Sequence, residues 1–345
     1  MNELDRIKSE MFHENEKLFL DIFDTEWNAL VEKLYYNQIQ LMIGNRIRPR
    51  LVYWGYSAGC YAGNKDQFYV PIKIATAIEL IHKSSILLDD YIDDDRIRRG
   101  KPTFFVEYGD KKTIIFVLNI LGNAIQVINE LSANDNITST DYYNIMQTLA
   151  NTMREMSLGV LKELELDESS QFDLNTIQDI IDKETSSLLS NSLLFGYYAS
   201  GHHSATSLEH IELIGRKCGY MFQTMNDLEP LCQATKNVEY KGHLNTDFVS
   251  KRKNIAITYL YPQLDNIDKT RLLHAQESHD NKIILDLVKK YGIAKQILTQ
   301  MHLLYENIIL LINQMKDFDA SEDWCIGFSG LISRLYYLCL ERLGK

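Results

Sequence analysis

Apolar residues recur at helical spacing along almost the whole chain, and no strand-like alternation of any weight interrupts them. Only five prolines and 17 glycines are spread over 345 residues, and no Gly/Ser-rich or Pro-rich linker separates the helical stretches. The pattern predicts helices near residues 3–23, 24–43, 47–60, 71–92, 110–131, 139–166, 173–200, 207–230, 247–260, 268–276, 280–316 and 322–342. We therefore expect an all-α fold in which residues 1–345 form one large helical domain.

The predicted helix 71–92 ends in a dense cluster of charge. Residues 89–99 have the sequence DDYIDDDRIRR, in which five carboxylates are followed by three arginines. Asp89 and Asp93 are four residues apart and share one helix face, with Asp90 beside them. Neighbouring like charges repel, so a bound cation has to offset them, and carboxylate and phosphate oxygens are ligands that Mg²⁺ prefers. The stretch therefore predicts a magnesium–diphosphate site, the alternative being a solvated acidic helix end.

The residues after the carboxylates fit the same chemistry. Arg98 and Arg99 carry forked donors that match phosphate oxygens. On this interpretation, replacing Asp90 by alanine should abolish turnover. It should leave stability almost unchanged, because it removes like-charge repulsion and no core contact.

The segment DDYIDDDRIRRGKPT, preceded by IELIHKSSILL, resembles the first aspartate-rich region of the trans-isoprenyl diphosphate synthases, the polyprenyl synthetase family. The resemblance extends over about residues 40–260. It implies a single large helical bundle of the isoprenoid synthase type. It also implies an enzyme that ionises an allylic prenyl diphosphate with Mg²⁺, about three ions with substrate bound, and joins it to isopentenyl diphosphate.

A second anchor of the resemblance is IGRKCGYMFQTMNDLEP, whose Gly215, Gly219, Phe222 and Gln223 fit the lead-in to the family's second aspartate-rich motif. In that motif Asn226 and Asp227 take the first two aspartate places and Pro230 the last. Glu229 lies three residues past Asn226 and is a substitute ligand. The resemblance thus assigns the metal to Asp89, Asp90, Asp93, Asn226, Asp227 and Glu229, and catalysis to Asp89, Asp90, Asp93, Arg98 and Asp227.

The family's Lys-Thr pair on the allylic diphosphate is altered here. Thr185 takes the threonine place, Glu184 takes the lysine place, and Lys183 lies one residue earlier, about 100° round the helix. Either the helix is locally adjusted so that Lys183 reaches the site, or a carboxylate replaces the cation. The predicted allylic diphosphate ligands are Arg98, Lys183, Thr185, Gln223, and, from a basic segment further on, Lys241 and Arg252.

The segment LMIGNRIRPRLVYWG partly matches the family's motif for isopentenyl diphosphate. Arg46, Arg48 and Pro49 fit, but Asn45 stands in the place of a lysine, which removes one positive charge. The predicted acceptor ligands are Arg46, Arg48, His82 and Arg99. Ser84 and Ser85, five and four residues before Asp89, stand where large residues stop chain growth in the family. Two small residues there predict a product or bound tail of at least C15, and favour C20 or longer.

The remaining inferences concern partners and location. A formal net charge of −11 argues against nucleic acid or an anionic membrane surface as the main partner. Five widely spaced cysteines without a CxxC motif indicate reduced thiols, and no apolar run predicts a membrane span, so we expect a cytoplasmic protein. The resemblance implies a homodimer.

The altered positions Asn45, Glu184 and Pro230 leave two other functions open. One is the same ionisation followed by cyclisation, or by transfer to another acceptor such as a peptide side chain or a phospho-acid. The other is a non-catalytic partner subunit, against which the intact Asp89–Asp93 set argues.

Overall fold

The computed structural model describes residues 3–34, 44–60, 65–166, 172–233, 254–278 and 280–342. Its elements in chain order are α1 (Glu3–Val31), α3 (Ile47–Gly59), η1 (Lys65–Phe68), α4 (Tyr69–Ile92), β1 (Ile97–Arg98), β2 (Lys101–Pro102), α5 (Phe104–Tyr108), α6 (Asp110–Asn129), η2 (Glu130–Ala133), α7 (Ser139–Leu164), α8 (Leu174–Ile181), the π-helical turn η4 (Asp182–Ser186), α9 (Ser187–Ala199), α10 (Ala205–Gln233), α11 (Ile255–Leu260), η6 (Tyr261–Gln263), α12 (Asn266–Glu277), α13 (Asn281–Lys290), α14 (Ile293–Gln314), η7 (Met315–Phe318) and α15 (Glu322–Arg342). The all-α prediction is confirmed.

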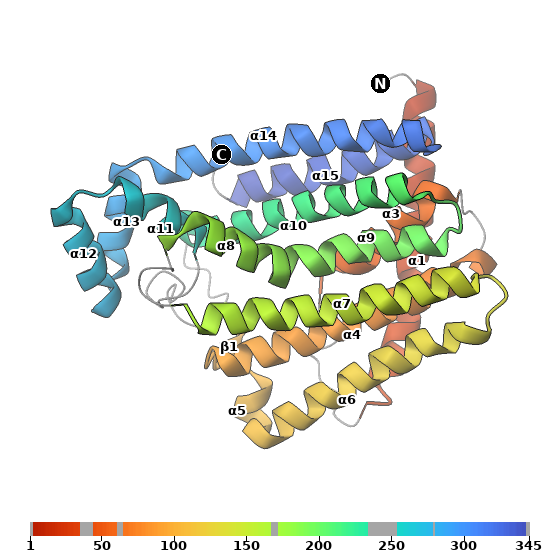
Figure 1. Cartoon of the computed structure of the whole chain (residues 1–345), viewed down its shortest axis with the longest axis horizontal. Coiled ribbons are helices and arrows are strands. Elements are labelled where there is room, and N and C mark those ends of the chain that lie inside the picture. The colour runs from red at the N-terminus through yellow and green to blue at the C-terminus, as the bar shows by residue number, and fades with distance from the viewer. Residues whose placement is uncertain are drawn as a thin grey trace.

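The long helices lie side by side in a bundle. Figure 1 shows α4, α6, α7, α9, α10 and α14 running along the long axis of the molecule, with α1 crossing them near one end. α4 and α10 both end toward the opposite end of the bundle, where β1, α8 and α11 also lie. The two aspartate-bearing segments are therefore at the same end of the molecule.

α9 is the central helix of the bundle. Its sequence is apolar or small on every side, and 12 of its 13 residues are buried. It contacts α3, α4, α7 and α10. At its crossing with α3 the two backbones nearly touch: a Cβ on Gly196 would lie 2.0 Å from the Val52 carbonyl oxygen, and one on Gly55 1.9 Å from that of Leu193. Only glycine permits this approach.

The first and last helices close the bundle through aromatic side chains. Trp54 of α3 stacks on Phe12 of α1 and on Phe328 of α15. Its indole N–H donates to Glu16 at 3.0 Å, and the Trp324 indole donates to the Trp54 carbonyl at 2.9 Å. The indole nitrogens of Trp54 and Trp324 are thus both hydrogen-bonded, which offsets the cost of burying them.

Several predicted boundaries need correction. The first helix continues past residue 23 to Val31, and the predicted helix 280–316 is interrupted at Gly292, whose φ of 64° is left-handed. The predicted helix 173–200 contains the π-turn η4. The hairpin β1–β2 and the short helix α5 follow the charge cluster and have too few residues for a periodic signal. Among the described cysteines, Cys60, Cys218, Cys325 and Cys339 are free thiols, as expected.

The expectation that no segment is apolar enough to cross a membrane is also corrected. Among the described residues, the stretch Asp110–Ala133 contains an 18-residue window with a mean hydropathy of 1.6, of which 39% is buried. In the fold, Phe116, Ile120 and Ala124 on its buried side belong to the core, and α6 packs against α4. A core helix of this kind meets the same length and composition criteria, so these do not make it a membrane span.

Candidate active site

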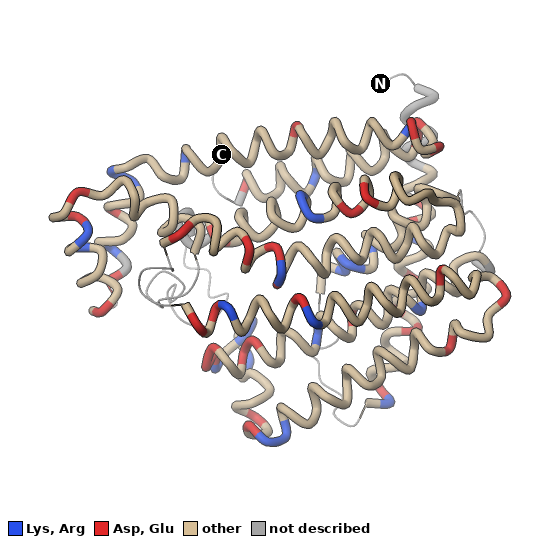
Figure 2. Tube along the Cα trace, viewed as in Figure 1, with Lys and Arg blue, Asp and Glu red and all other residues tan. Residues whose placement is uncertain are grey.

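The acidic end of α4 is held in place by the hairpin that follows it. Ile97 pairs with Pro102 and Arg98 with Lys101, and the two turn residues, Arg99 and Gly100, have φ of 52° and 73°. Positive φ at both turn positions is what a two-residue hairpin requires. The hairpin thereby folds the arginines back toward the carboxylates, and Figure 2 shows acidic and basic residues gathered there.

Arg98 binds the carboxylate of Asp90. Its Nε donates to Asp90 Oδ1 at 2.6 Å and its Nη2 lies 2.5 Å from the same oxygen, while Asp89 Oδ2 is 3.6 Å away. Asp90 is 1% exposed, and burial raises the pKa of its carboxyl above the ordinary value, although Arg98 lowers it. The sequence-based expectation that Asp90 makes no structural contact is therefore wrong, because its charge is buried and paired.

The carboxylates at the end of α4 fit a divalent cation that a substrate helps to bind. Asp89 is 58% exposed, and Asp93, half-buried, follows it by one helical turn. The second oxygen of Asp90 is buried, and within the described part of the chain it has no hydrogen-bond partner. No group of three or more His, Cys, Asp or Glu residues in that part forms a complete metal cage. This donor set suits Mg²⁺, which uses one or two carboxylates and takes its other ligands from phosphate and water.

The predicted residues of α10 and the Lys-Thr region form a chain of hydrogen bonds. Thr185 donates to Gln223 Oε1 at 3.0 Å, and Gln223 Nε2 donates to Asp227 Oδ1 at 2.8 Å. The other oxygen of Asp227 accepts from the backbone N–H of Ile255 at 3.2 Å. Asp227 therefore also anchors the start of α11, a role that the motif alone did not indicate. Asn226 beside it is half-buried.

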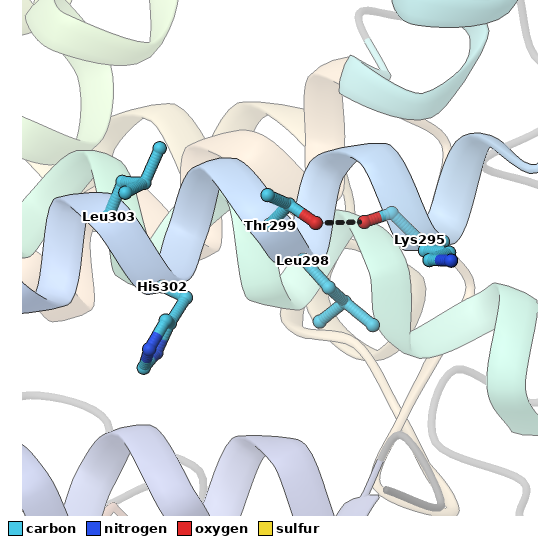
Figure 3. A pocket seen from close by; sticks show the side chains of 5 residues that line it. All are labelled: Lys295, Leu298, Thr299, His302 and Leu303. Atoms are coloured by element: carbon cyan, nitrogen blue, oxygen red, sulfur yellow. Dashed lines mark hydrogen bonds between the residues drawn. The ribbon is translucent and has the colours of Figure 1, made fainter.

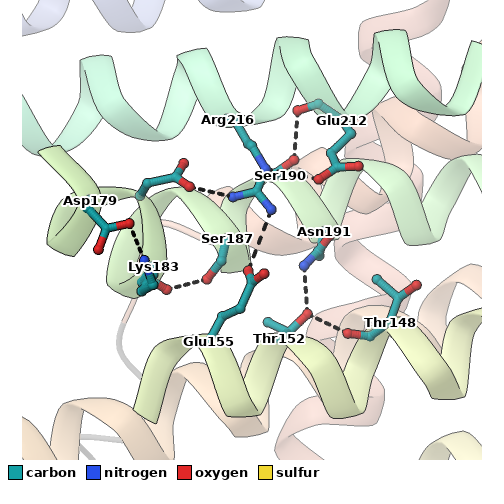
Figure 4. A network of polar contacts seen from close by, with 11 residues as sticks. Thr148, Thr152, Glu155, Asp179, Lys183, Ser187, Ser190, Asn191, Glu212 and Arg216 are labelled. Carbon is teal, nitrogen blue, oxygen red and sulfur yellow. Dashed lines mark hydrogen bonds and ion pairs between the residues drawn. The ribbon is translucent and has the colours of Figure 1, made fainter. Parts of the chain in front are cut away.

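The π-turn η4 is a local adjustment of the helix at the altered Lys-Thr position. Its extra residue places Glu184 against α7, where a Cβ on Gly159 would lie 2.6 Å from Glu184 Cγ. Lys183 makes a short ion pair with Asp179, which also binds Lys162 at 2.8 Å. The helix is thus locally adjusted at this position, and Lys183 is bound by the carboxylate of Asp179 (Figure 4).

An arginine that the motifs do not mark lies beside this turn. Arg216 binds Glu212 at 2.9 Å and Asp182 at 2.8 Å, with Glu155 at 3.5 Å (Figure 4). Burial lowers the pKa of Arg216, but the neighbouring carboxylates raise it above its ordinary value overall. Arg216 therefore links α7, α10 and η4 as a permanent cation.

Three of the predicted acceptor residues, Arg46, Arg48 and His82, belong to α4 or to the start of α3, two helices that pack against each other. Arg46 ion-pairs with Asp24 at 2.9 Å and Glu79 at 3.1 Å, and its guanidinium lies over the rings of Phe23 and Trp27. Burial lowers the pKa of Arg48 to about 10, although Glu79 raises it. Burial and then the cations Arg48, Lys83, Arg98 and Arg99 hold the pKa of His82 well below its ordinary value, so the imidazole is neutral. Arg99 itself is exposed on the hairpin turn.

Ser84 and Ser85 have small side chains whose hydroxyl groups are already bonded. Ser84 is buried and donates to the Ile81 carbonyl at 2.7 Å, and Ser85 donates to the His82 carbonyl at 2.9 Å. Neither hydroxyl therefore demands a polar partner from outside its own helix. The side chain of Glu229 and the residues Lys241 and Arg252 lie outside the described residues.

One pocket lies away from all these residues. It has a volume of about 350 Å³ and is lined by Lys295, Leu298, Thr299, His302 and Leu303 of α14 (Figure 3). The lining has no carboxylate, so it offers no site for a metal-bound diphosphate. The predicted metal and diphosphate ligands among the described residues lie elsewhere, at α3, α4, the β1–β2 hairpin, η4 and α10.

Comparison with known proteins gives one family. The model of the polyprenyl synthetase family matches residues 30–291. The chain is 26% identical over 263 residues to the short chain isoprenyl diphosphate synthase of Methanocaldococcus jannaschii, which covers 75% of this chain and 76% of that protein. It is 26% identical over 292 residues to the farnesyl diphosphate synthase of Buchnera aphidicola, covering 80% and 93%.

A solved structure extends the likeness to the fold. The polyprenyl synthase from Caulobacter crescentus CB15, complexed with calcium and isoprenyl diphosphate, has a TM-score of 0.75 and 17% identity. The alignment covers 94% of this chain and 96% of that one.

Proposed function

This chain belongs to the polyprenyl synthetase family and is a prenyltransferase, and we propose that it uses Mg²⁺ to ionise an allylic diphosphate and condense it with isopentenyl diphosphate. The proposed product is a trans-polyprenyl diphosphate with a chain of C15–C20 or longer. The observation that carries the proposal is the end of α4, where Asp89 and Asp93 share one face and Arg98 is bound to Asp90.

Each residue of this site has a part in the proposed reaction. Asp89, Asp90 and Asp93 at the end of α4 would hold the metal together with Asn226 and Asp227 of α10, and Glu229 is a further proposed ligand. The bound metal supplies a Lewis acid that stabilises the charge developing on the departing diphosphate. Arg98, held by Asp90, contributes a fixed positive charge beside that group. Lys183, Thr185, Gln223, Lys241 and Arg252 are the other proposed contacts of the allylic diphosphate.

The acceptor diphosphate is proposed to bind Arg46, Arg48, His82 and Arg99. His82 is neutral in this structure, so it would act as a hydrogen-bond partner and not as a charge. Apolar helix faces exclude water from the allylic cation.

The experiment is an incubation of the purified chain with Mg²⁺ and C10, C15 or C20 allylic diphosphates, with and without isopentenyl diphosphate. Longer diphosphates that form only with the acceptor support elongation. Hydrocarbon or alcohol formed without it favours cyclisation or another acceptor. No pyrophosphate release under either condition favours a non-catalytic partner subunit.

We also propose that the chain is a homodimer that associates through α6 and α7. Ile115 and Leu118 on α6 are 65% and 59% exposed, and Leu161 and Leu164 at the end of α7 are similarly open. Gly122 belongs to the same side of α6, and a Cβ added to it would have no described atom within 4 Å beyond its own stretch of helix. A patch of large apolar side chains of this kind is a common feature of subunit interfaces.

A further inference from the structure

Lys83 is a buried cation beside the acceptor residues, and no motif in the sequence accounts for it. Its side chain is 4% exposed, and its Nζ lies 3.5 Å from Glu79 Oε1. The same oxygen is 3.1 Å from Arg46 Nη1, so two cations share one carboxylate. A Cβ on Gly44 would lie 3.2 Å from Lys83 Nζ. The ammonium group of α4 therefore lies directly against the turn that precedes α3.

Among the described residues of this cluster, positive charge exceeds negative charge. Burial lowers the pKa of Lys83, the Glu79 carboxylate raises it, and the cations Arg46 and Arg99 lower it further. Arg48 also lies close enough to Glu79 for that carboxylate to affect its pKa. Lys83, Arg46, Arg48 and Arg99 are thus four cations of this cluster. Its described carboxylates are the buried one of Glu79 and the half-exposed one of Asp24, and both bind Arg46. A cluster with this imbalance is stabilised by an anion that carries about two negative charges or more.

Arg48 supplies an independent indication of a ligand. Its Nε is buried, and among the described residues it has no hydrogen-bond acceptor. A buried guanidinium nitrogen without an acceptor is costly, and phosphate oxygens match its geometry. The excess charge and the open donor therefore point to the same kind of ligand.

We propose that Lys83 binds the diphosphate of the acceptor and supplies the positive charge that the turn lacks at Asn45. This inference rests on the proposed function and assigns one more ligand to its acceptor site. Asn45 is exposed, whereas Lys83 reaches the turn from beneath, through the space left by Gly44. The charge is thus provided by α4 and not by the loop before α3.

The test compares Lys83→Gln with Lys73→Gln. Lys83→Gln leaves Glu79 paired with Arg46, so the fold should be retained. Lys73 lies on the same helix but pairs with Glu130 at 2.9 Å and with Glu26, outside the cluster. Steady-state kinetics give KM for isopentenyl diphosphate and for the allylic substrate separately. Calorimetry with inorganic pyrophosphate, without allylic substrate or metal, measures anion binding directly.

The expected result is a KM for isopentenyl diphosphate raised about tenfold or more in Lys83→Gln, which corresponds to the loss of one charge-assisted hydrogen bond. The KM for the allylic substrate and kcat should change less than twofold, and Lys73→Gln should behave as the wild type. The inference is overturned if Lys83→Gln keeps its acceptor KM, or if Lys73→Gln raises it equally.

Failure of the proposed function is a separate outcome, namely that the wild type forms no longer diphosphate. In that case the calorimetric comparison still decides the inference. Pyrophosphate binding that is lost in Lys83→Gln and kept in Lys73→Gln supports the anion site, and equal binding by both variants overturns it.

Discussion

At the residue scale, Asp90 has two roles that its motif does not separate. It is one of the proposed metal ligands, and it also holds Arg98 at the end of α4. Asp89, one residue earlier, is mostly exposed and has only a distant contact with the same arginine. Substitutions of Asp89 and of Asp90 can therefore distinguish a loss of activity from a loss of stability.

We predict that Asp90→Ala abolishes turnover and also lowers the free energy of unfolding by about 1–3 kcal/mol, because it leaves the guanidinium of Arg98 without its partner. Asp89→Asn should abolish turnover with an unchanged Tm, because exposed pairs contribute little. Thermal denaturation and pyrophosphate release measure the two effects. An active Asp89→Asn variant would show that this carboxylate binds no metal.

Ser85 gives a prediction about product length. A phenylalanine here would fill the space that the small side chain leaves beside α4, so Ser85→Phe should shorten the main product by at least one C5 unit. Ser85→Ala is the matched control and should leave the product distribution unchanged, because the lost hydroxyl is bonded only to its own helix. Chromatography of the dephosphorylated products measures both. An unchanged product in Ser85→Phe would place the end of the tail pocket elsewhere.

At the element scale, the crossing of α3 and α9 depends on Gly55 and Gly196. Each of these glycines lies against the backbone of the opposite helix. We predict that Gly196→Ala lowers the free energy of unfolding by about 1–3 kcal/mol or more, because the helices must separate to admit a methyl group. Gly330→Ala on α15 is the control. Among the described residues, no atom beyond its own stretch of helix lies within 4 Å of the added Cβ, so the change should raise stability by about 0.5–1 kcal/mol.

Urea denaturation of the three proteins measures these differences. A Gly196→Ala variant as stable as the wild type would show that the α3–α9 contact can relax. The same reasoning separates Gly159 of α7 from Gly122 of α6. A Cβ on Gly159 would meet Glu184 of η4, whereas no described atom outside its own stretch of helix lies within 4 Å of a Cβ on Gly122.

At the scale of the whole molecule, the exposed apolar side chains of α6 are the proposed contact between the two subunits of a homodimer. We predict that Ile115→Glu, combined with Leu118→Glu, converts a dimer to a monomer, because charged side chains cannot be buried unpaired in an interface. Leu310→Glu, at a similarly exposed leucine of α14, should leave the mass unchanged. Light scattering at several concentrations measures the mass. A wild-type protein that is monomeric at all of them would contradict the proposed dimer.

Local patterns in the sequence were sufficient for the helices and for the acidic cluster. Helical periodicity depends on residues three and four apart, so the stretches that form α4, α7 and α10 were predictable to within a few residues. The same holds for Asp89 and Asp93, whose spacing along one helix sets their common face. These features are properties of short segments, and no other part of the chain is needed to specify them.

The ion-pair partners of the charged residues could be identified only once the helices were packed together. The contact of Arg98 with Asp90 depends on a hairpin whose turn has positive φ. The sharing of Glu79 by Arg46 and Lys83 joins the segment before α3 to the middle of α4. Because burial and ion pairing depend on groups that are far apart in the chain, no motif could assign these charges. Short segments were enough to mark the groups proposed to carry the chemistry, whereas packing set which charged groups face one another.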